Sequence, residues 1–264
     1  MTSFHVPSGA SGEVLPKSQP LAALNTGDAP AFRVSSPGAD DGTSAQRAFW
    51  ADQEKRRVRQ VHGAVASVLM GGMLPWRSAE ERDLIYVLEA DTGIEAIDAM
   101  PEKIDFVQGG VQRSHVPALR VRQCGRIALL DALRHGEERS RSRSALTATL
   151  RQLYASRGMR YIAVERCAVR AEPRFSNGLY VLQARGYEPP LDQELLIIEA
   201  LTRRGRCTLA ELDRATDHPT IRAAALALAL KRRLDLDVST AATPDDIAVS
   251  LRPGAGEGGH YVEL

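Results

Sequence analysis

Apolar and polar residues change their spacing several times along the chain, and these changes divide it into parts. Residues 1–43 are rich in Ser, Gly, Pro and Ala and have no hydrophobic period, so we predict a disordered N-terminal arm. From Ser44 onward, apolar residues recur among charged ones in a helix-like pattern, which the pair Gly71-Gly72 ends. We therefore expect a helix at the start of the first folded domain, which we place at residues 44–188.

A second amphipathic pattern, at residues 77–90, predicts a helix with a defined start. Ser78 has the type and position of an N-cap, and Glu81, three residues later, matches the acid of a capping box. Capping alone would account for Glu81. This structural role therefore has to be weighed against any catalytic role of the same side chain.

The rest of the first domain alternates between strand-like and helix-like patterns. Pro173 and the pair Asn177-Gly178 are expected to interrupt its last helix. This order of elements predicts a mixed α/β domain. The expected strands are residues 94–97, 103–107, 115–122, 127–133 and 160–165, and the expected helices are residues 145–155 and 167–185.

A second domain, at residues 189–253, has a different signature. Three helices followed by a hairpin are typical of winged-helix modules, which bind DNA or dock proteins. The middle of the third helix is almost wholly apolar, so we expect a core helix there, with few side chains free to read bases. The glycine-rich residues 254–264 are expected to form a flexible tail. The expected helices are residues 191–204, 208–215 and 220–233, and the strands are residues 234–239 and 247–252.

Composition bears on the compartment. With 44% hydrophobic and 25% charged residues the chain is ordinary for a soluble protein, and its apolar runs are too short to cross a bilayer. The cysteines Cys124, Cys167 and Cys207 fit neither a disulfide framework nor a zinc site. The start of the chain has no secretory signal pattern. We therefore expect a cytoplasmic protein without membrane contact.

The net charge of +1 conceals a local excess of arginine, because residues 139–160 contain six arginines and no acid. Clustered guanidinium groups attract the phosphates of double-stranded DNA, since each neutralised phosphate releases counterions. The alternative is a solvated helix face. Further basic clusters occur at residues 203–206 and 231–233. The predicted DNA-binding residues are Arg139, Arg141, Arg143, Arg151, Arg157 and Arg160.

A single acid, Asp131, interrupts the apolar strand predicted at residues 127–133. Burying a carboxylate is costly unless it is paired, hydrogen-bonded or bound to a cation, so such an acid is often part of a site. The alternative is that Asp131 lies at the end of the strand and faces water. The sequence leaves both interpretations open.

Short motifs between residues 77 and 187 occur in an order that resembles the TnsA-type endonucleases of cut-and-paste transposons. Glu81 corresponds to the first catalytic Glu of that family, and Asp131 to an acid that is followed, two residues on, by Lys. The resemblance implies a restriction-endonuclease-like fold, a winged-helix-like second domain, and partners such as a transposase or an AAA+ ATPase regulator. The motifs are Ser78-Ala79-Glu80-Glu81-Arg82-Asp83, Met100-Pro101, His115-Val116-Pro117-Ala118-Leu119, Leu129-Leu130-Asp131-Ala132-Leu133 and Tyr161-Ile162-Ala163-Val164-Glu165.

Two positions depart from that family. Phosphodiester hydrolysis with magnesium needs converging carboxylates and usually a Lys near the attacking water. Residues two apart on a strand face the same side, so position 133 would face the site together with Asp131. That position is Leu133, and Ala118 stands where the family has its metal-binding Asp. Glu81 and Asp131 remain as a catalytic remnant and, if the protein is active, as the magnesium ligands.

Three functional hypotheses follow from this remnant. The first is a catalytically degenerate nuclease of a mobile element or phage system, which binds double-stranded DNA, bridges protein partners, or both, and needs no cofactor. The second is an active magnesium-dependent endonuclease that cuts at transposon ends, with His115 or Arg134 as a substitute for the missing Lys. The third is a structural adaptor that does not bind DNA.

Overall fold

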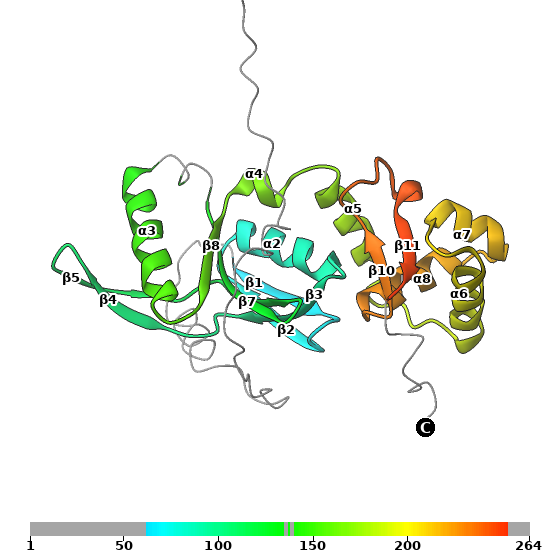
Figure 1. Ribbon diagram of the computed structural model, residues 1–264, viewed down its shortest axis with the longest axis horizontal. Coiled ribbons are helices and arrows are strands. Elements are labelled where there is room, and N and C mark those ends of the chain that lie inside the picture. The colour runs from blue at the N-terminus through cyan, green and yellow to red at the C-terminus, as the bar shows by residue number, and fades with distance from the viewer. Residues whose placement is uncertain (1–61, 135–136, 138–139, 253–264) are drawn as a thin grey trace, which may run out of the picture.

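The computed structural model describes residues 62–134, 137 and 140–252. The predicted arm and tail, residues 44–61 of the first predicted helix, and Arg139 lie outside this part. The described part is mixed α/β, with seven α-helices and four small β-sheets (Figure 1). None of these helices combines the length and apolarity needed to span a membrane.

A β-hairpin replaces the end of the helix predicted from residue 44 onward, so that prediction is wrong for residues 63–67. Strand β1 (Gly63–Ser67) pairs antiparallel with β2 (Gly72–Trp76), and Gly71 turns the chain with φ +65°. The buried Glu89 carboxylate accepts hydrogen bonds from the N–H groups of residues 68 and 69, at 2.7 and 3.0 Å. The pairing with β2 and the contact with Glu89, which lies about twenty residues further along the chain, decide against the helix.

Helix α2 (Ala79–Ala90) begins as the sequence predicts. The Ser78 hydroxyl accepts the N–H of Glu81 at 3.2 Å and so caps the helix. The other half of the expected capping box is wrong, because the Glu81 carboxylate bonds the N–H of Arg77 instead. Leu84, Ile85, Val87 and Leu88 are buried and form one side of the first hydrophobic core.

A four-stranded sheet forms the centre of the first part of the molecule. Its strand order is β3-β6-β7-β8, antiparallel throughout except for the parallel pair β7-β8, which α3 connects (Figure 1). The strands predicted here are confirmed, although the expected strand 115–122 begins only at Leu119. Helix α3 starts earlier than expected because Ser140 caps it. The elements are β3 (Ile94–Ala99), β6 (Leu119–Gln123), β7 (Arg126–Ala132), α3 (Arg141–Ala155) and β8 (Arg160–Val164).

A separate two-stranded hairpin lies between β3 and β6 in the sequence. Strands β4 (Ile104–Gln108) and β5 (Val111–His115) are joined by Gly109 and Gly110, whose φ values of +59° and +77° suit a tight two-residue turn. Ile104 and Phe106 anchor the hairpin, since they pack in a core with Leu150 and Tyr154 of α3.

Three short helices connect the sheet to the second part of the molecule. Pro173 separates α4 from α5, as predicted, but Asn177 and Gly178 lie inside α5, so the second expected interruption is wrong. Asn177 is buried, and its amide donates to the carbonyls of Val238 and Ala241, at 3.1 and 2.8 Å. The helices are α4 (Arg166–Val169), α5 (Arg174–Val181) and the short 3-10 helix η3 (Leu182–Ala184).

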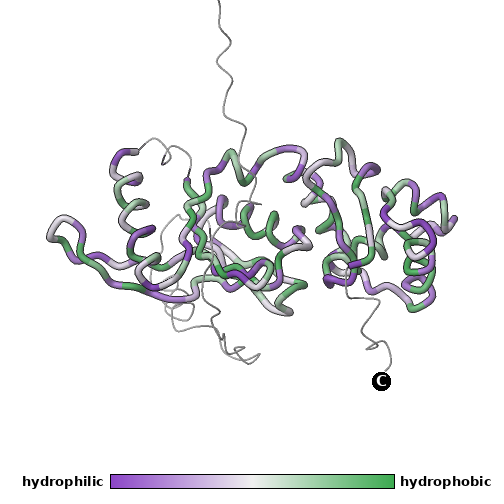
Figure 2. Tube along the Cα trace, viewed as in Figure 1, coloured by the Kyte–Doolittle hydropathy of each residue, from purple (hydrophilic) through white to green (hydrophobic). Residues whose placement is uncertain are grey.

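The second part contains the three helices and two strands that the sequence predicts, plus one short strand. Gly205 ends α6 with φ +72°, and Thr208 forms a capping box with Glu211 at the start of α7. Helix α8 is buried from residue 224 to residue 230 and is a hydrophobic stretch in Figure 2, which confirms the predicted core helix. The elements are α6 (Leu191–Arg204), β9 (Cys207–Thr208), α7 (Leu209–Thr216), α8 (Ile221–Leu230), β10 (Leu234–Asp237), η4 (Pro244–Asp246) and β11 (Ala248–Leu251).

The two parts pack tightly where α2 meets the segment after α8. The Arg232 guanidinium donates to the carbonyls of Ile94 and Glu89, at 2.8 and 3.0 Å. Thr92 and Leu236 are joined by a hydrogen bond of 3.2 Å between the Leu236 N–H and the Thr92 hydroxyl. Because these groups are buried or half-buried and satisfied by each other, the second part is held against the first rather than tethered by a linker.

Candidate functional site

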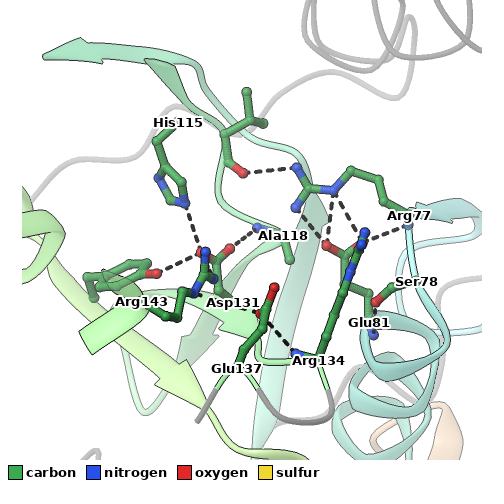
Figure 3. Close-up of polar contacts among 11 residues, drawn as sticks. Arg77, Ser78, Glu81, His115, Ala118, Asp131, Arg134, Glu137 and Arg143 are labelled. Carbon is green, nitrogen blue, oxygen red and sulfur yellow. Dashed lines mark hydrogen bonds and ion pairs between the residues drawn. The ribbon is translucent and has the colours of Figure 1, made fainter. Parts of the chain in front are cut away.

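Asp131 lies at the end of β7 and is buried, with only 5% of its surface exposed. One carboxylate oxygen accepts the N–H of Ala118 at 2.9 Å. The other accepts the Tyr161 hydroxyl at 2.6 Å and lies 2.8 Å from Nε2 of His115 (Figure 3). The interpretation that Asp131 faces water is therefore wrong, and the carboxylate is part of a buried polar cluster.

The surroundings of Asp131 favour its charged form. Burial on its own would raise the pKa of the carboxyl, but the hydrogen bond and charge of His115, with the donors of Tyr161 and Ala118, lower it to about 2. Burial, together with the charge of the same carboxylate, raises the pKa of the Tyr161 hydroxyl. Nδ1 of His115 lies 3.1 Å from the hydroxyl of Tyr154, so both ring nitrogens have partners.

Arg143, in the first turn of α3, adds a cation beside this cluster. Its Nη2 lies 3.6 Å from Asp131, and its Nε lies 3.8 Å from the carboxylate of Glu137. Arg143 is half-buried and points toward β7 (Figure 3). Of the predicted DNA-binding residues, Arg143 is therefore engaged within the protein, and its main contact is with the candidate site.

Glu81 lies in the first turn of α2 and is enclosed by Arg77. The Arg77 backbone N–H donates to one carboxylate oxygen at 2.6 Å, and Nε and Nη2 donate to the other at 3.0 and 2.7 Å. The remaining nitrogen, Nη1, donates to the carbonyl of Val116 at 3.0 Å. This two-pronged contact between guanidinium and carboxylate is a strong, well-oriented ion pair.

The structure brings Glu81 and Asp131 into one neighbourhood, on either side of residues 116–118. Arg77 bonds the carbonyl of Val116, and the N–H of Ala118 bonds Asp131, so the two carboxylates flank the same short segment (Figure 3). Burial alone would lower the pKa of Arg77, but the charges of Glu81 and Asp131 raise it. Arg77 is therefore paired directly with Glu81, and the charge of Asp131 adds to the stabilisation of its guanidinium.

The residues of this site do not fit a magnesium ion. Magnesium takes hard oxygen ligands, whereas the side chains of Ala118 and Leu133 bring none. The oxygens of Glu81 and Asp131 already accept N–H and O–H donors of the protein. Among residues 62–134, 137 and 140–252 no group of three His, Cys, Asp or Glu side chains is placed to hold a metal. The cations at this site are Arg77 and Arg143, with His115 when it is protonated.

The proposed substitutes for the missing Lys differ in their placement. His115 contacts Asp131 directly, as described above. Arg134 is exposed, and its backbone N–H donates to Glu137 at 3.1 Å (Figure 3). Leu133 is buried, and its N–H continues the sheet by donating to the carbonyl of Val164 at 2.8 Å. The side chain that follows Asp131 on the same face thus contributes packing and no charge.

Three residues of the site were missed by the sequence reasoning. Tyr161 lies two residues before Ala163, the partner of Asp131 in the β7-β8 register, and so shares its face. Tyr154 is reached only through His115. Arg77 gave a usable signal, because it lies four residues before Glu81, the spacing at which opposite charges meet near a helix.

The exposed arginines of α3 and its surroundings form a basic surface. Arg141, Arg151, Arg157 and Arg160 are exposed, and we call these four residues the α3 basic face. In the basic clusters of the second part, Arg206 pairs with Asp237 at 3.0 Å, and Arg233 pairs with Glu194 at 2.6 Å. The charge of those clusters is therefore partly neutralised within the protein.

A comparison with protein-family models finds no match for this chain, and a comparison with curated proteins finds no significant match. The site is therefore interpreted from its geometry and its chemistry.

Proposed function

We propose that this chain is a catalytically degenerate, TnsA-like nuclease-fold protein that binds double-stranded DNA and bridges protein partners. The observation that carries the proposal is the position of two buried carboxylates, Glu81 at the start of α2 and Asp131 at the end of β7, on either side of residues 116–118. Their placement supports an ancestral metal site, and the cations paired with each of them support its loss.

The order of elements in the first part supports a restriction-endonuclease-like fold. Helix α2, three antiparallel strands, helix α3 and a strand parallel to β7 follow one another, with the β4-β5 hairpin inserted between the first two strands of the sheet. The order of the second part, helix, short strand, two helices and two strands, supports a winged-helix-like domain. We therefore propose a restriction-endonuclease-like first part and a winged-helix-like second part.

The α3 basic face supports binding to the DNA backbone. Its four arginines come from one helix, the turn after it and the start of β8, on the outside of the sheet. A phosphate backbone gains affinity from each neutralised charge, without any base-specific contact. Helix α8 is buried, so base reading by this helix, the usual role of the third helix in a winged-helix module, is not part of the proposal.

Titration of labelled duplex DNA at several salt concentrations tests the DNA-binding function. The triple variant R141E/R151E/R157E is expected to reduce the slope of log K against log salt concentration by about 3, since each phosphate contact contributes about 0.9. The variant R203E/R204E/R214E, which makes the same change of charge on exposed positions of α6 and α7, is the matched control. Equal binding by the wild type and the α3 variant would refute the assignment of the DNA-binding surface.

A plasmid assay tests the loss of catalysis. Supercoiled plasmid is incubated with the protein and Mg²⁺ or Mn²⁺, and we expect no nicked or linear product. Cutting that disappears in the Asp131→Asn variant would support the active endonuclease in place of our proposal, and cutting that persists in that variant would indicate a contaminant.

A specific surface favours the bridging role. Leu191 and Leu195 lie one turn apart on α6 and are 70% and 56% exposed. Exposed large apolar side chains at this spacing form a stripe that suits a partner protein, such as a transposase or an AAA+ ATPase regulator. The variant L191D/L195D should abolish capture of such a partner while duplex binding stays unchanged. Loss of DNA binding in that variant would contradict the separation of the two surfaces.

A further inference from the structure

The β4-β5 hairpin forms an arm at one end of the molecule. It projects beyond α3 in Figure 1, and its tip consists of the two-residue Gly109-Gly110 turn. A strand of five residues extends about 17 Å, so the arm is long enough to reach past the surface of α3. Within the described part of the chain these strands pair only with each other.

One face of strand β4 is held against α3, from Ile104 to Gln108. Ile104 and Phe106 are buried against α3, and the amide of Gln108 donates to the hydroxyl of Thr149 on α3 at 3.1 Å. The arm therefore holds a fixed position beside the helix that carries two arginines of the α3 basic face. A ligand that lies along α3 and extends toward the hairpin would therefore contact the arm.

The tip of the arm is apolar, and the strand behind it is polar. Val111 directly follows the turn and Val107 lies two residues before it, on the opposite face of the hairpin; they are 56% and 62% exposed, respectively, although valine is usually buried. Gln112, Arg113 and Ser114 follow on β5 and are exposed. These side chains offer donors, acceptors and methyl groups, the same set that reads base edges in a DNA groove.

We propose that the tip of the β4-β5 arm enters a groove of the duplex that lies on the α3 basic face, with Val107 and Val111 packed within the groove from the two faces of the ribbon and Arg113 within reach of a base edge or phosphate. This inference rests on the proposed DNA binding. A two-stranded ribbon fits the major groove, which is about 12 Å wide, and apolar side chains at an arm tip also serve as wedges in the minor groove. The arm adds contact with bases to a face that contacts only the backbone.

Charge favours DNA over a protein partner as the occupant. The arm carries one acid, Asp105, which pairs with Lys103 at 3.5 Å, and the exposed Arg113, and the neighbouring surface carries the arginines of α3. A strand of a partner protein could pair with the edge of β5, but such pairing uses backbone hydrogen bonds and would not require the surrounding arginines. Protein binding at the arm is therefore an outcome that the test has to distinguish.

Dimethyl sulfate footprinting combined with duplex titration tests the arm. The reagent methylates N7 of guanine in the major groove and N3 of adenine in the minor groove, so the positions protected by the wild type show which groove the arm enters. The variant V107S/V111S should bind about tenfold more weakly, because two exposed valines no longer bury their surface, and should lose the protected bases. Its salt slope should equal that of the wild type, since no phosphate contact is removed. L191S/L195S on α6 is the matched control and should bind like the wild type.

The outcomes separate the arm from the proposed function. Absence of duplex binding by the wild type at low salt overturns the DNA-binding function and the arm with it. Wild-type binding with equal affinity and protection in V107S/V111S overturns the arm alone. A variant that keeps DNA binding but loses a protein partner also overturns it, in favour of a protein occupant. Thermal unfolding is the control for folding: V107S/V111S should melt at the same temperature as the wild type, because both substitutions are on exposed positions.

Discussion

The substitution Asp131→Asn tests how strongly the protein holds a buried charge in the candidate site. Burial favours the neutral acid, yet the hydrogen bond and charge of His115, with Tyr161 and the Ala118 N–H, keep the pKa of the carboxyl at about 2, against 3.8 for an ordinary Asp. This difference corresponds to about 2 kcal/mol of folding stability at neutral pH. The asparagine removes this pH-dependent contribution and retains most of the volume.

The sign of the pH dependence follows from proton binding. The folded pKa is depressed, so in acid the unfolded chain takes up a proton before the folded protein does. The contribution is therefore fully present above about pH 5 and is lost as the pH falls toward the folded pKa. Between pH 5 and pH 3 the wild type should lose about 1 kcal/mol more stability than D131N.

Urea unfolding followed by circular dichroism, at a series of pH values, measures this difference. Asp98→Asn is the matched control on the same sheet, because Asp98 forms a half-exposed ion pair with Arg120 at 2.7 Å. That substitution should cost less than about 1 kcal/mol. If the stability curves of D131N and the wild type run parallel from pH 7 to pH 3, the reasoning about the Asp131 cluster is refuted.

Three further predictions concern buried acids. Glu89→Gln should cost about 1–3 kcal/mol in urea unfolding, because an amide N–H₂ would face the N–H donors of the β1-β2 turn; an unchanged midpoint would contradict this. Arg77→Met should cost about 2–3 kcal/mol by leaving Glu81 without its cation, and the double variant with Glu81→Met should recover most of it; no recovery would argue against the pair. Ala118→Asp should lower the melting temperature when a chelator is present, and Mn²⁺ should restore part of this loss. Ala128→Asp, at another buried position of the sheet, should also lower the melting temperature, but Mn²⁺ should restore none of it. Equal recovery in the two variants would argue against a former metal site.

Local signals in the sequence predicted the elements that depend on local chemistry. Gly205 ends α6 and Thr208 caps α7, at the residues that the sequence indicates. The turn between β6 and β7 contains Cys124 and Gly125, both with positive φ, between two strands that were also expected. In these places the conformation is determined by a few neighbouring residues, and a single sequence contains that information.

The wrong prediction of a helix at β1 shows the limit of such local signals. Val65, Val68 and Leu69 have spacings that suit a helix, but the segment pairs with β2, and its turn is closed by a carboxylate from α2. The apolar positions of a short segment fit both periods, so its partners decide between helix and strand. Those partners are known only once the whole chain has folded.

The sequence pointed to the two acids of the candidate site, but not to the groups that neutralise them. Glu81 and Asp131 were identified as a pair, and the structure brings them together. Their partners come from separate elements: His115 from the β4-β5 hairpin, Tyr161 from β8 and Arg143 from α3. These contacts depend on strand order and helix placement, which spacing along the chain does not determine. The burial of Asp131 therefore remained open at the level of sequence.

The protein's own groups compensate the burial of both acids. A buried carboxylate needs a compensating charge or several donors, and here Arg77 supplies the charge for Glu81 while His115, Arg143, Tyr161 and the Ala118 N–H surround Asp131. A metal at the same place would compete with these groups for the same oxygens. Introducing an Asp at position 118 and a Lys at position 133 would therefore not be enough to create a metal site. Arg77 would also have to release the carboxylate of Glu81.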